Sequence, residues 1–250
     1  MNSGEEEMLN IVIPMAGLGS RFVKAGYDLP KPLIDINGVP MIEVVVKNLT
    51  PSIPHRFVFI CQMQHEDKYS IKTRLERIAP GCVVVCIDGI TEGAACTVLA
   101  AREHIDNEAP LMIANSDQYV DILIDDYLSY ISNSELDGLI MTMEADDPKW
   151  SYVRVDSEHK VVEIKEKVVI SNEATVGIYN FSRGADFCRA ADLMIAAEEK
   201  QNNEYYVAPV YEKLIPTGYK VGIHNIGKEG DGMYGLGIPH DLQFFLTLNF

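Results

Sequence analysis

A glycine-rich turn followed by basic residues is the stretch of this chain best suited to binding phosphate. Gly17 and Gly19 follow an apolar run, and Arg21 and Lys31 come shortly after. Glycine has no Cβ, so the backbone of such a turn can approach a ligand closely, and its successive N–H groups can bind an anion. The whole chain has a net charge of -16. A local group of cations in so acidic a protein therefore indicates a site for a polyanion such as a nucleoside triphosphate.

Two common nucleotide-binding patterns do not fit this turn. The dinucleotide fingerprint G-x-G-x-x-G has Phe22 where its third glycine should be, and no Gly-Lys-Ser/Thr ends the loop as the P-loop requires. Pro30 and Pro32 restrict the backbone on both sides of Lys31, so its ammonium group is presented from a stiff segment. The alternative is an ordinary solvent-exposed lysine between two turn prolines.

The run from Gly17 to Phe22, followed by Pro30-Lys31-Pro32-Leu33, resembles the signature of the sugar-phosphate nucleotidyltransferases, the nucleoside-diphosphate-sugar pyrophosphorylases. The resemblance extends over nearly the whole chain. It implies an α/β fold, a three-layer α/β/α Rossmann-like nucleotidyltransferase fold with a mixed, mainly parallel sheet and a smaller antiparallel substrate lobe. We expect one domain over residues 9–250, with a nucleotide-binding half (10–135), an acceptor-binding half (136–250) and a flexible acidic tail (1–8), and without the β-helix domain of longer relatives.

The resemblance also implies roles for individual residues. Arg21 would bind the leaving pyrophosphate, Lys31 would lie near the α-phosphate, and Lys167 would hold the acceptor phosphate. Gly93 lies in the turn that would receive the base, although helix packing explains the small residues there almost as well. The residues implied in nucleotide binding are Met15, Ala16, Gly17, Leu18, Gly19, Ser20, Thr91, Glu92, Gly93 and Ser116.

Asp117 is the strongest candidate for a metal ligand. It follows a predicted strand, and magnesium is usually held by one or two carboxylates plus substrate phosphates. The alternative is a helix N-cap or an Asx turn, because a helical pattern follows. The resemblance implies that Asp117 binds Mg²⁺. Many relatives carry a second aspartate where this chain has Gly235, so a second ligand would come from elsewhere, with Asp231 the nearest candidate, or the metal would be held by Asp117 and phosphates.

The acceptor-binding half contains a motif similar to the Glu-Lys motif of the same family. In residues 163–167 the resemblance implies that Glu166 contacts a sugar hydroxyl and that Lys167 contacts the acceptor phosphate. Val168 follows at the position where the family usually has proline. Gly177 and Tyr152 are further predicted substrate-binding residues. The alternatives are a solvated strand with alternating charges and, for Gly177, a β-bulge.

Alternating strand and helix patterns must position these residues. Because ligands bind at the carboxyl ends of parallel strands, the glycine turn, the turn at 91–93 and Asp117 should meet at one edge of the sheet. The predicted strands are 11–13, 57–61, 83–87, 111–114, 139–143, 152–155, 161–164, 175–181 and 219–223. The predicted helices are 40–48, 71–78, 94–103, 122–131, 185–199, 207–214 and 239–248.

Composition limits the function classes. The pI near 4.7 argues against nucleic acid as a partner, because affinity for a phosphate backbone needs many basic contacts. No apolar run approaches the roughly 20 residues that span a membrane, and the acidic start of the chain is unlike a secretory signal. We therefore expect a cytoplasmic protein with no membrane partner, and we consider a homodimer. The five cysteines form no C-x-x-C pair and are expected to be reduced.

The expected function is that of a Mg²⁺-dependent nucleotidyltransferase. An NMP group would pass from an NTP (CTP, UTP or dTTP) to a sugar 1-phosphate, giving a nucleotide sugar for surface polysaccharide and pyrophosphate. Three alternatives stay open. They are a cytidylyltransferase for a non-sugar phosphate such as phosphocholine, a non-catalytic nucleotide-binding protein, and a glycosyltransferase, which would release a nucleoside diphosphate.

Overall fold

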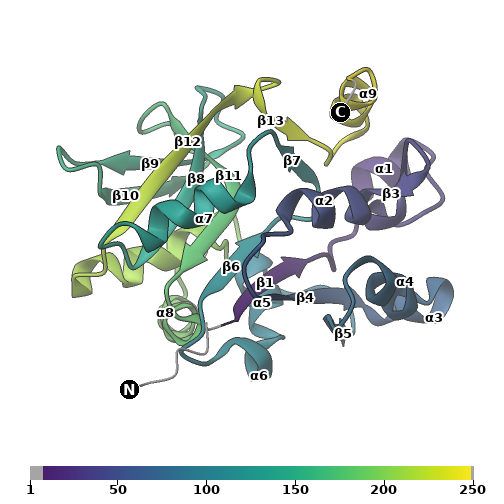
Figure 1. The fold of residues 1–250 in the computed structure, drawn as a ribbon, viewed down its shortest axis with the longest axis horizontal. Helices are drawn as coiled ribbons and strands as arrows, with labels where there is room; N and C mark the ends of the chain where they lie inside the picture. Colours follow the sequence, from purple (N-terminus) through teal and green to yellow (C-terminus); the bar gives the residue numbers. More distant parts are fainter. Residues whose placement is uncertain (1–7, 249–250) are drawn as a thin grey trace.

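The computed structural model describes residues 8–248, so of the predicted acidic tail only Met8 belongs to the described part. The main sheet has eleven strands, nine of them in the order β5-β4-β1-β6-β11-β8-β12-β13-β7 and two in the β9–β10 hairpin, which pairs with β11, while β2 and β3 form a separate two-stranded sheet. Most neighbours run parallel, while β11 and β7 are antiparallel to the strands beside them. Helices cover both faces of the sheet (Figure 1). The predicted α/β fold with a mixed, mainly parallel sheet is confirmed.

The bounds of the elements follow the chain. The strands are β1 Leu9–Pro14, β2 Asp35–Ile36, β3 Val39–Pro40, β4 His55–Gln62, β5 Val83–Ile87, β6 Leu111–Ala114, β7 Gln118–Val120, β8 Gly138–Glu144, β9 Ser151–Val155, β10 Val161–Glu166, β11 Glu173–Phe181, β12 Val221–Glu229 and β13 Gly232–Gly235. The α-helices are α1 Ser20–Lys24, α2 Met41–Leu49, α3 Met63–Tyr69, α4 Ile71–Ile78, α5 Ala94–Leu99, α6 Arg102–Ile105, α7 Ile124–Ser132, α8 Gly184–Ala196 and α9 Pro239–Leu246. Three 3₁₀ helices are η1 Lys31–Leu33, η2 Ala208–Lys213 and η3 Ile215–Thr217.

Two hydrophobic cores lie on the two faces of the sheet. On β1, Ile11 and Ile13 belong to the core beneath α2, whereas Val12 between them belongs to the core that contains residues of α5 and α8. This division follows from the pleat of a strand, which points successive side chains to opposite faces. Strands buried on both faces read as continuous apolar runs, which is why 11–13 and 111–114 are recognisable in the sequence.

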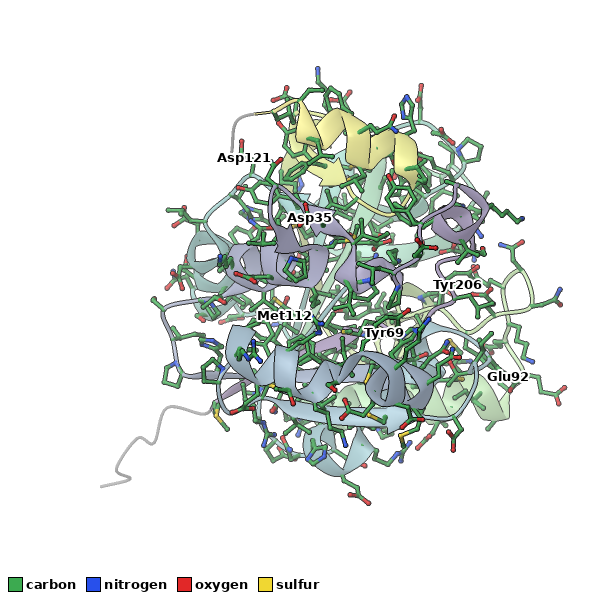
Figure 2. All side chains as sticks on the ribbon, turned by 90° about the vertical axis from the view of Figure 1, so that its right-hand side faces the viewer. Asp35, Tyr69, Glu92, Met112, Asp121 and Tyr206 are labelled. Atoms are coloured by element: carbon green, nitrogen blue, oxygen red, sulfur yellow. The ribbon has the colours of Figure 1, made fainter. Side chains whose placement is uncertain are left out.

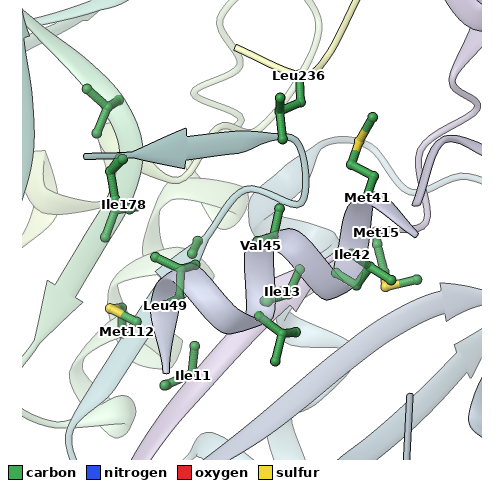
Figure 3. Packing of buried hydrophobic residues seen from close by; sticks show 14 of the residues in the cluster. Ile11, Ile13, Met15, Met41, Ile42, Val45, Leu49, Met112, Ile178 and Leu236 are labelled. Atoms are coloured by element: carbon green, nitrogen blue, oxygen red, sulfur yellow. The ribbon is translucent and has the colours of Figure 1, made fainter. Parts of the chain in front are cut away.

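The two predicted halves share one sheet and both hydrophobic cores. Antiparallel pairing of β6 with β11 joins them, with Asn180 opposite Met112. Near the end of the chain β13 returns to pair with β7, and α9 packs beside it (Figure 1). In Figure 3 side chains from the first half, such as Met112, and from the second half, Ile178 and Leu236, surround α2 in one cluster.

Most predicted elements are present, and a few predictions are wrong. Strands 83–87 and 111–114 match β5 and β6. The helix predicted over 94–103 is two short helices, and that at 207–214 is 3₁₀. The short strands β7 and β13 and the helix α3 were not predicted. Because β7 follows Asp117 and α7 begins only at Ile124, Asp117 is not a helix N-cap. All five cysteines are free, and no helix in residues 8–248 is long and apolar enough to cross a membrane.

Candidate functional site

The glycine-rich turn leaves the carboxyl end of β1 with its amides facing outward. Within residues 8–248, the backbone N–H groups of Gly17, Leu18 and Gly19 donate no hydrogen bond. Gly19 has φ +60°, a conformation that favours glycine, and it caps α1. Met15 is different, because its side chain is buried and its N–H donates to the Ile60 carbonyl at 2.8 Å. Within the run 15–20 predicted to bind the nucleotide, the free backbone N–H groups therefore lie in residues 17–19.

Lys31 and Asp117, which are far apart in the sequence, meet beside this turn. The Lys31 Nζ donates to the Asp117 Oδ2 at 2.8 Å, and the two side chains are 20% and 25% exposed. Pro32 and Leu33 are buried, so they anchor the segment that carries Lys31. A Cβ added to Gly19 would lie 3.2 Å from the Lys31 Cβ. Glycine at position 19 thus allows the turn and the Lys31 segment to approach each other.

Arg21 lies in the first turn of α1, two residues after Gly19, and its side chain is exposed. Its carbonyl accepts from the Ala25 N–H, but its guanidinium group makes no hydrogen bond or ion pair with the described residues. An arginine with free N–H groups can bind phosphate oxygens in a bidentate manner. The structure therefore brings Lys31 and Asp117 into contact and leaves Arg21 available next to the turn.

The turn at Thr91–Gly93 is tied to the segment 201–206 of the second half. The Tyr205 N–H donates to the Glu92 carbonyl at 2.8 Å, and the Ala95 N–H donates to the Tyr205 carbonyl at 3.0 Å. A Cβ at Gly93 would lie 2.5 Å from the Tyr205 backbone. The Thr91 hydroxyl shares a hydrogen bond with the Thr97 hydroxyl, and Glu92 forms an ion pair with Lys200. These side chains have structural partners, so any contact with a base would come from the backbone of this turn.

A cavity of about 260 Å³ opens beside Lys167, and its wall includes Glu166. The Glu166 side chain is 5% exposed and accepts a hydrogen bond from the Ser151 hydroxyl. Burial raises the pKa of the Glu166 carboxyl. Lys167 has φ +57°, and its Nζ lies 3.2 Å from the Tyr206 hydroxyl and 3.9 Å from the Glu166 Oε1. Glu166 thus lines the cavity, whereas the Lys167 side chain is 45% exposed and contacts the cavity wall through Tyr206.

Aromatic residues that were not predicted form other walls of this cavity. They are Trp150, Tyr179 and Tyr206. Tyr206 and Glu92 both appear at one side of the molecule in Figure 2. The prediction that Tyr152 binds substrate is wrong for this conformation, because Tyr152 is fully buried and its hydroxyl donates to the Asp147 carbonyl at 2.8 Å. Successive residues of a strand face opposite sides, and the neighbour Ser151 on β9 lines the cavity.

Gly177 lies at an irregularity of β11, where the register with β8 shifts between Thr175 and Tyr179. It has φ +83°, and a Cβ there would lie 2.0 Å from the Asn115 Nδ2. The β-bulge interpretation is therefore confirmed, and the missing Cβ gives room to Asn115, which lines the cavity. Beneath it, Gln118 is 6% exposed, and its Nε2 has no hydrogen-bond partner in the described residues. Ser116 is also buried.

Two carboxylates lie against the segment 235–237. A Cβ at Gly237 would lie 2.3 Å from the Asp117 Oδ2, and one at Gly235 would lie 3.1 Å from the Asp241 Oδ2. The suggestion that Asp231 replaces the family aspartate is wrong, because it belongs to the β12–β13 turn next to Lys228, several residues along β13 from Gly235. The described residues contain no group of three or more metal-ligating side chains. Any metal here would have two protein carboxylates at most.

The fold and this geometry define an α/β protein with a cationic, glycine-rich site at the carboxyl ends of a mainly parallel sheet. A family model described as "Nucleotidyl transferase" matches residues 11–220. The chain therefore belongs to the nucleotidyl transferase family, as the glycine turn and the Lys31 segment predicted.

Similar proteins extend this result. The nucleoside-diphosphate-sugar pyrophosphorylase from Vibrio cholerae RC9 superposes with a TM-score of 0.80 at 25% identity, covering 95% of this chain and 100% of that one. The bifunctional protein GlmU of Methanococcus aeolicus is 24% identical over 238 residues, which are 94% of this chain and 53% of that protein. The 2-aminoethylphosphonate cytidylyltransferase of Lancefieldella rimae is 49% identical over 120 residues, covering 42% of this chain and 49% of that protein. The chain spans about half the length of these curated relatives.

Proposed function

We propose that this protein transfers an NMP group from an NTP to the phosphorus-bound oxygen of a small acceptor and releases pyrophosphate. The observation that carries the proposal is the contact of Lys31 with Asp117 beside the free amides of Gly17 to Gly19. This arrangement offers a cradle for the triphosphate and two charged side chains at its edge. One candidate acceptor class is a sugar 1-phosphate, because the structural neighbour of TM-score 0.80 is a nucleoside-diphosphate-sugar pyrophosphorylase.

The chemistry needs positioning and charge neutralisation more than proton transfer. An acceptor oxygen attacks the α-phosphorus in line, a new P–O bond forms, and the bond to the bridging oxygen of the β-phosphate breaks with its electron pair leaving on pyrophosphate. The acceptor is already anionic, so no general base is required. Lys31 would stabilise charge near the α-phosphate, Arg21 charge on the leaving pyrophosphate, and Lys167 would hold the acceptor.

Magnesium fits the donor set as a cofactor of this proposal. Proteins usually hold Mg²⁺ with one or two carboxylates plus substrate phosphates, and the segment 235–237 lacks the Cβ atoms that would displace the Asp117 and Asp241 carboxylates. Asp117 would be the principal ligand and Asp241 the second carboxylate, in place of the aspartate missing at 235. The chemistry that bound Mg²⁺ supplies is neutralisation of phosphate charge.

A second candidate is cytidylyl transfer to a phosphorus acceptor that is not a sugar. The specific observation in its favour is the identity of 49% over 120 residues with a 2-aminoethylphosphonate cytidylyltransferase, which is twice the identity to GlmU. This segment covers 42% of the chain, so it supports the reaction type and leaves the acceptor to experiment.

Pyrophosphate release tests both candidates. We would incubate the protein and Mg²⁺ with each of CTP, UTP, dTTP and GTP against a panel of sugar 1-phosphates, phosphocholine and 2-aminoethylphosphonate. We expect pyrophosphate with at least one pair, in amounts equal to the new nucleotide-linked product. Formation of free nucleoside diphosphate would instead indicate a glycosyltransferase. Nucleotide binding without any product across the panel would contradict the proposal and favour a non-catalytic nucleotide-binding protein.

A further inference from the structure

Glu166 is a buried carboxylate in the wall of this cavity, and among the described residues Lys167 is the one cation that forms an ion pair with it, while Lys149 lines the same cavity. Its side chain is 5% exposed, and the Lys167 Nζ is 3.9 Å away, beyond hydrogen-bond distance. Lys167 instead donates its hydrogen bond to the Tyr206 hydroxyl. The nearby Glu204 adds further negative charge, which also raises the pKa of Glu166. Because burying a carboxylate is costly unless a cation or strong donors accompany it, this wall is suited to a cationic group brought by the ligand.

Aromatic rings next to Glu166 favour the same kind of group. Trp150 and Tyr206 both line the cavity, and each ring already lies close to a lysine ammonium. The Lys149 Nζ is 4.8 Å from the Trp150 ring centroid, and the Lys167 Nζ is 5.3 Å from that of Tyr206. A cation over an aromatic face is stabilised by roughly 0.5–2 kcal/mol, with the larger values where water is excluded.

The hydroxyl groups of the cavity walls are bonded within the protein, whereas the Trp150 Nε1 has no hydrogen-bond partner in the described residues. The Thr175 and Tyr179 hydroxyls bond to each other at 3.0 Å, and the Ser151 hydroxyl bonds to Glu166. The Tyr206 hydroxyl accepts from Lys167 at 3.2 Å. A bound hexose buries several hydroxyl groups, and each one that finds no partner costs about 1–3 kcal/mol. The hydroxyl groups of these walls therefore already have hydrogen-bond partners within the protein.

We propose that the acceptor is an aminoalkyl phosphate or phosphonate whose ammonium group lies against Glu166 between Trp150 and Tyr206, with its phosphorus group at Lys167. This inference rests on the proposed nucleotidyl transfer and names its acceptor class. The side chains of Glu166 and Lys167 present opposite charges 3.9 Å apart. They therefore match a small zwitterion whose charges are separated by a short alkyl chain, and the attacking oxygen remains one of those on phosphorus.

Acceptor binding can be measured apart from turnover, because Trp150 is the single tryptophan of the chain. We would titrate the protein without nucleotide and follow tryptophan fluorescence with 2-aminoethylphosphonate, propylphosphonate, phosphocholine and glucose 1-phosphate. Propylphosphonate replaces the ammonium by a methyl group of similar size. We expect 2-aminoethylphosphonate or phosphocholine to bind at least about tenfold more tightly than propylphosphonate. Preference for the primary amine would assign the recognition mainly to Glu166, and preference for phosphocholine mainly to the rings. Equal binding of the amines and propylphosphonate would overturn the inference.

The variant Glu166→Gln tests the carboxylate with little change in shape. We expect it to raise the KM for 2-aminoethylphosphonate at least about tenfold, with a smaller effect on kcat and no effect on propylphosphonate. The matched control is Glu163→Gln on the same strand, whose carboxylate pairs with Arg154 outside the cavity, and it should behave as the unaltered protein. Glu166→Gln removes a buried charge, so its Tm at neutral pH should not fall.

The outcomes separate this inference from the proposed reaction. Efficient transfer to glucose 1-phosphate with no preference for an amine would overturn the inference and leave nucleotidyl transfer in place. Selective binding of the amine with no pyrophosphate from any NTP would contradict the proposed reaction, and with it the acceptor role, while keeping the ammonium site. An equal KM for 2-aminoethylphosphonate in Glu166→Gln and Glu163→Gln would remove Glu166 from the site.

Discussion

The ion pair between Lys31 and Asp117 can be replaced by contacts with a ligand. Both side chains are partly exposed, and a pair of this kind contributes about 0–1 kcal/mol to stability because water screens it. An incoming triphosphate can therefore attract Lys31, and a cation can attract Asp117, at small cost to the fold. The ion pair keeps each group in place until substrate arrives.

Arg21→Ala and Lys31→Ala are each expected to lower kcat/KM by at least about a hundredfold, the scale of losing one preorganised charge contact in the transition state. The measurement is steady-state pyrophosphate release with the best substrate pair. Lys24→Ala is the matched control, because Lys24 is exposed on the same short helix one turn after Arg21. Near-normal rates in both variants, or an equal loss in Lys24→Ala, would contradict the roles assigned to Arg21 and Lys31.

The sequence predicted the phosphate-binding part of the candidate site better than the aromatic wall of the cavity. The glycine turn, Lys31 and Asp117 could be grouped from the sequence because each follows a strand end at one edge of a parallel sheet. The aromatic wall could not, because Trp150 and Tyr206 come from segments about fifty residues apart that meet only in the folded chain. The error at Tyr152 has a simple cause. Successive residues of a strand face opposite sides, so a shift of one position exchanges a core residue for a cavity residue.

Among the elements, the segment 201–206 has a structural role that the sequence did not reveal. Its backbone bonds to Glu92 and Ala95 in the first half, while Tyr206 reaches the acceptor cavity. This segment therefore links the turn next to the predicted base site with the aromatic wall. Gly93 makes the link possible, because any side chain there would collide with the backbone of Tyr205.

Gly93→Ala should lower the Tm by several degrees and raise the KM for the acceptor, because the new Cβ would lie 2.5 Å from the Tyr205 backbone. A strained backbone of this kind costs of order 1–3 kcal/mol, and each kcal/mol is worth about 2–4 °C in a protein of this size. Gly89→Ala is the control, since Gly89 also has a positive φ but has no atom within 4 Å of its added Cβ. A fall in Tm equal to that of Gly89→Ala would show that the contact with Tyr205 is unimportant.

Strands were predicted correctly where a short apolar run marks them in the sequence. They were missed where they form only by pairing with a distant segment of the chain. The strands β5 and β6 are short apolar runs between turn residues, so their bounds were predicted correctly. The strands β7 and β13 have only three and four residues and carry no clear alternation. They exist because Tyr234 pairs with Tyr119 across more than a hundred residues of chain. No window of sequence around either strand contains that information.

At the scale of the whole molecule, the sheet joins the two predicted halves instead of dividing them. From the acceptor side β11 pairs with β6 and β13 pairs with β7, so four strands of the second half lie between β6 and β7 of the first half. Removing residues 136–250 would expose the edge of β6 that pairs with β11 and would take Ile178 and Leu236 out of the apolar cluster around α2. A nucleotide-binding half that folds by itself is therefore not expected from this architecture.

Thermal unfolding should accordingly occur as one transition for the entire chain. The single tryptophan, Trp150, reports on the acceptor-binding half, whereas far-UV circular dichroism reports on all helices and strands, so the two melting curves should coincide. A ligand that binds only the folded state raises stability by RT ln(1 + [L]/Kd). The NTP should therefore raise the Trp150 midpoint and the dichroism midpoint equally, although it binds in the other half. Two separated midpoints, or a nucleotide shift seen by dichroism and absent from Trp150 fluorescence, would show that the halves unfold independently and that the shared sheet does not couple them.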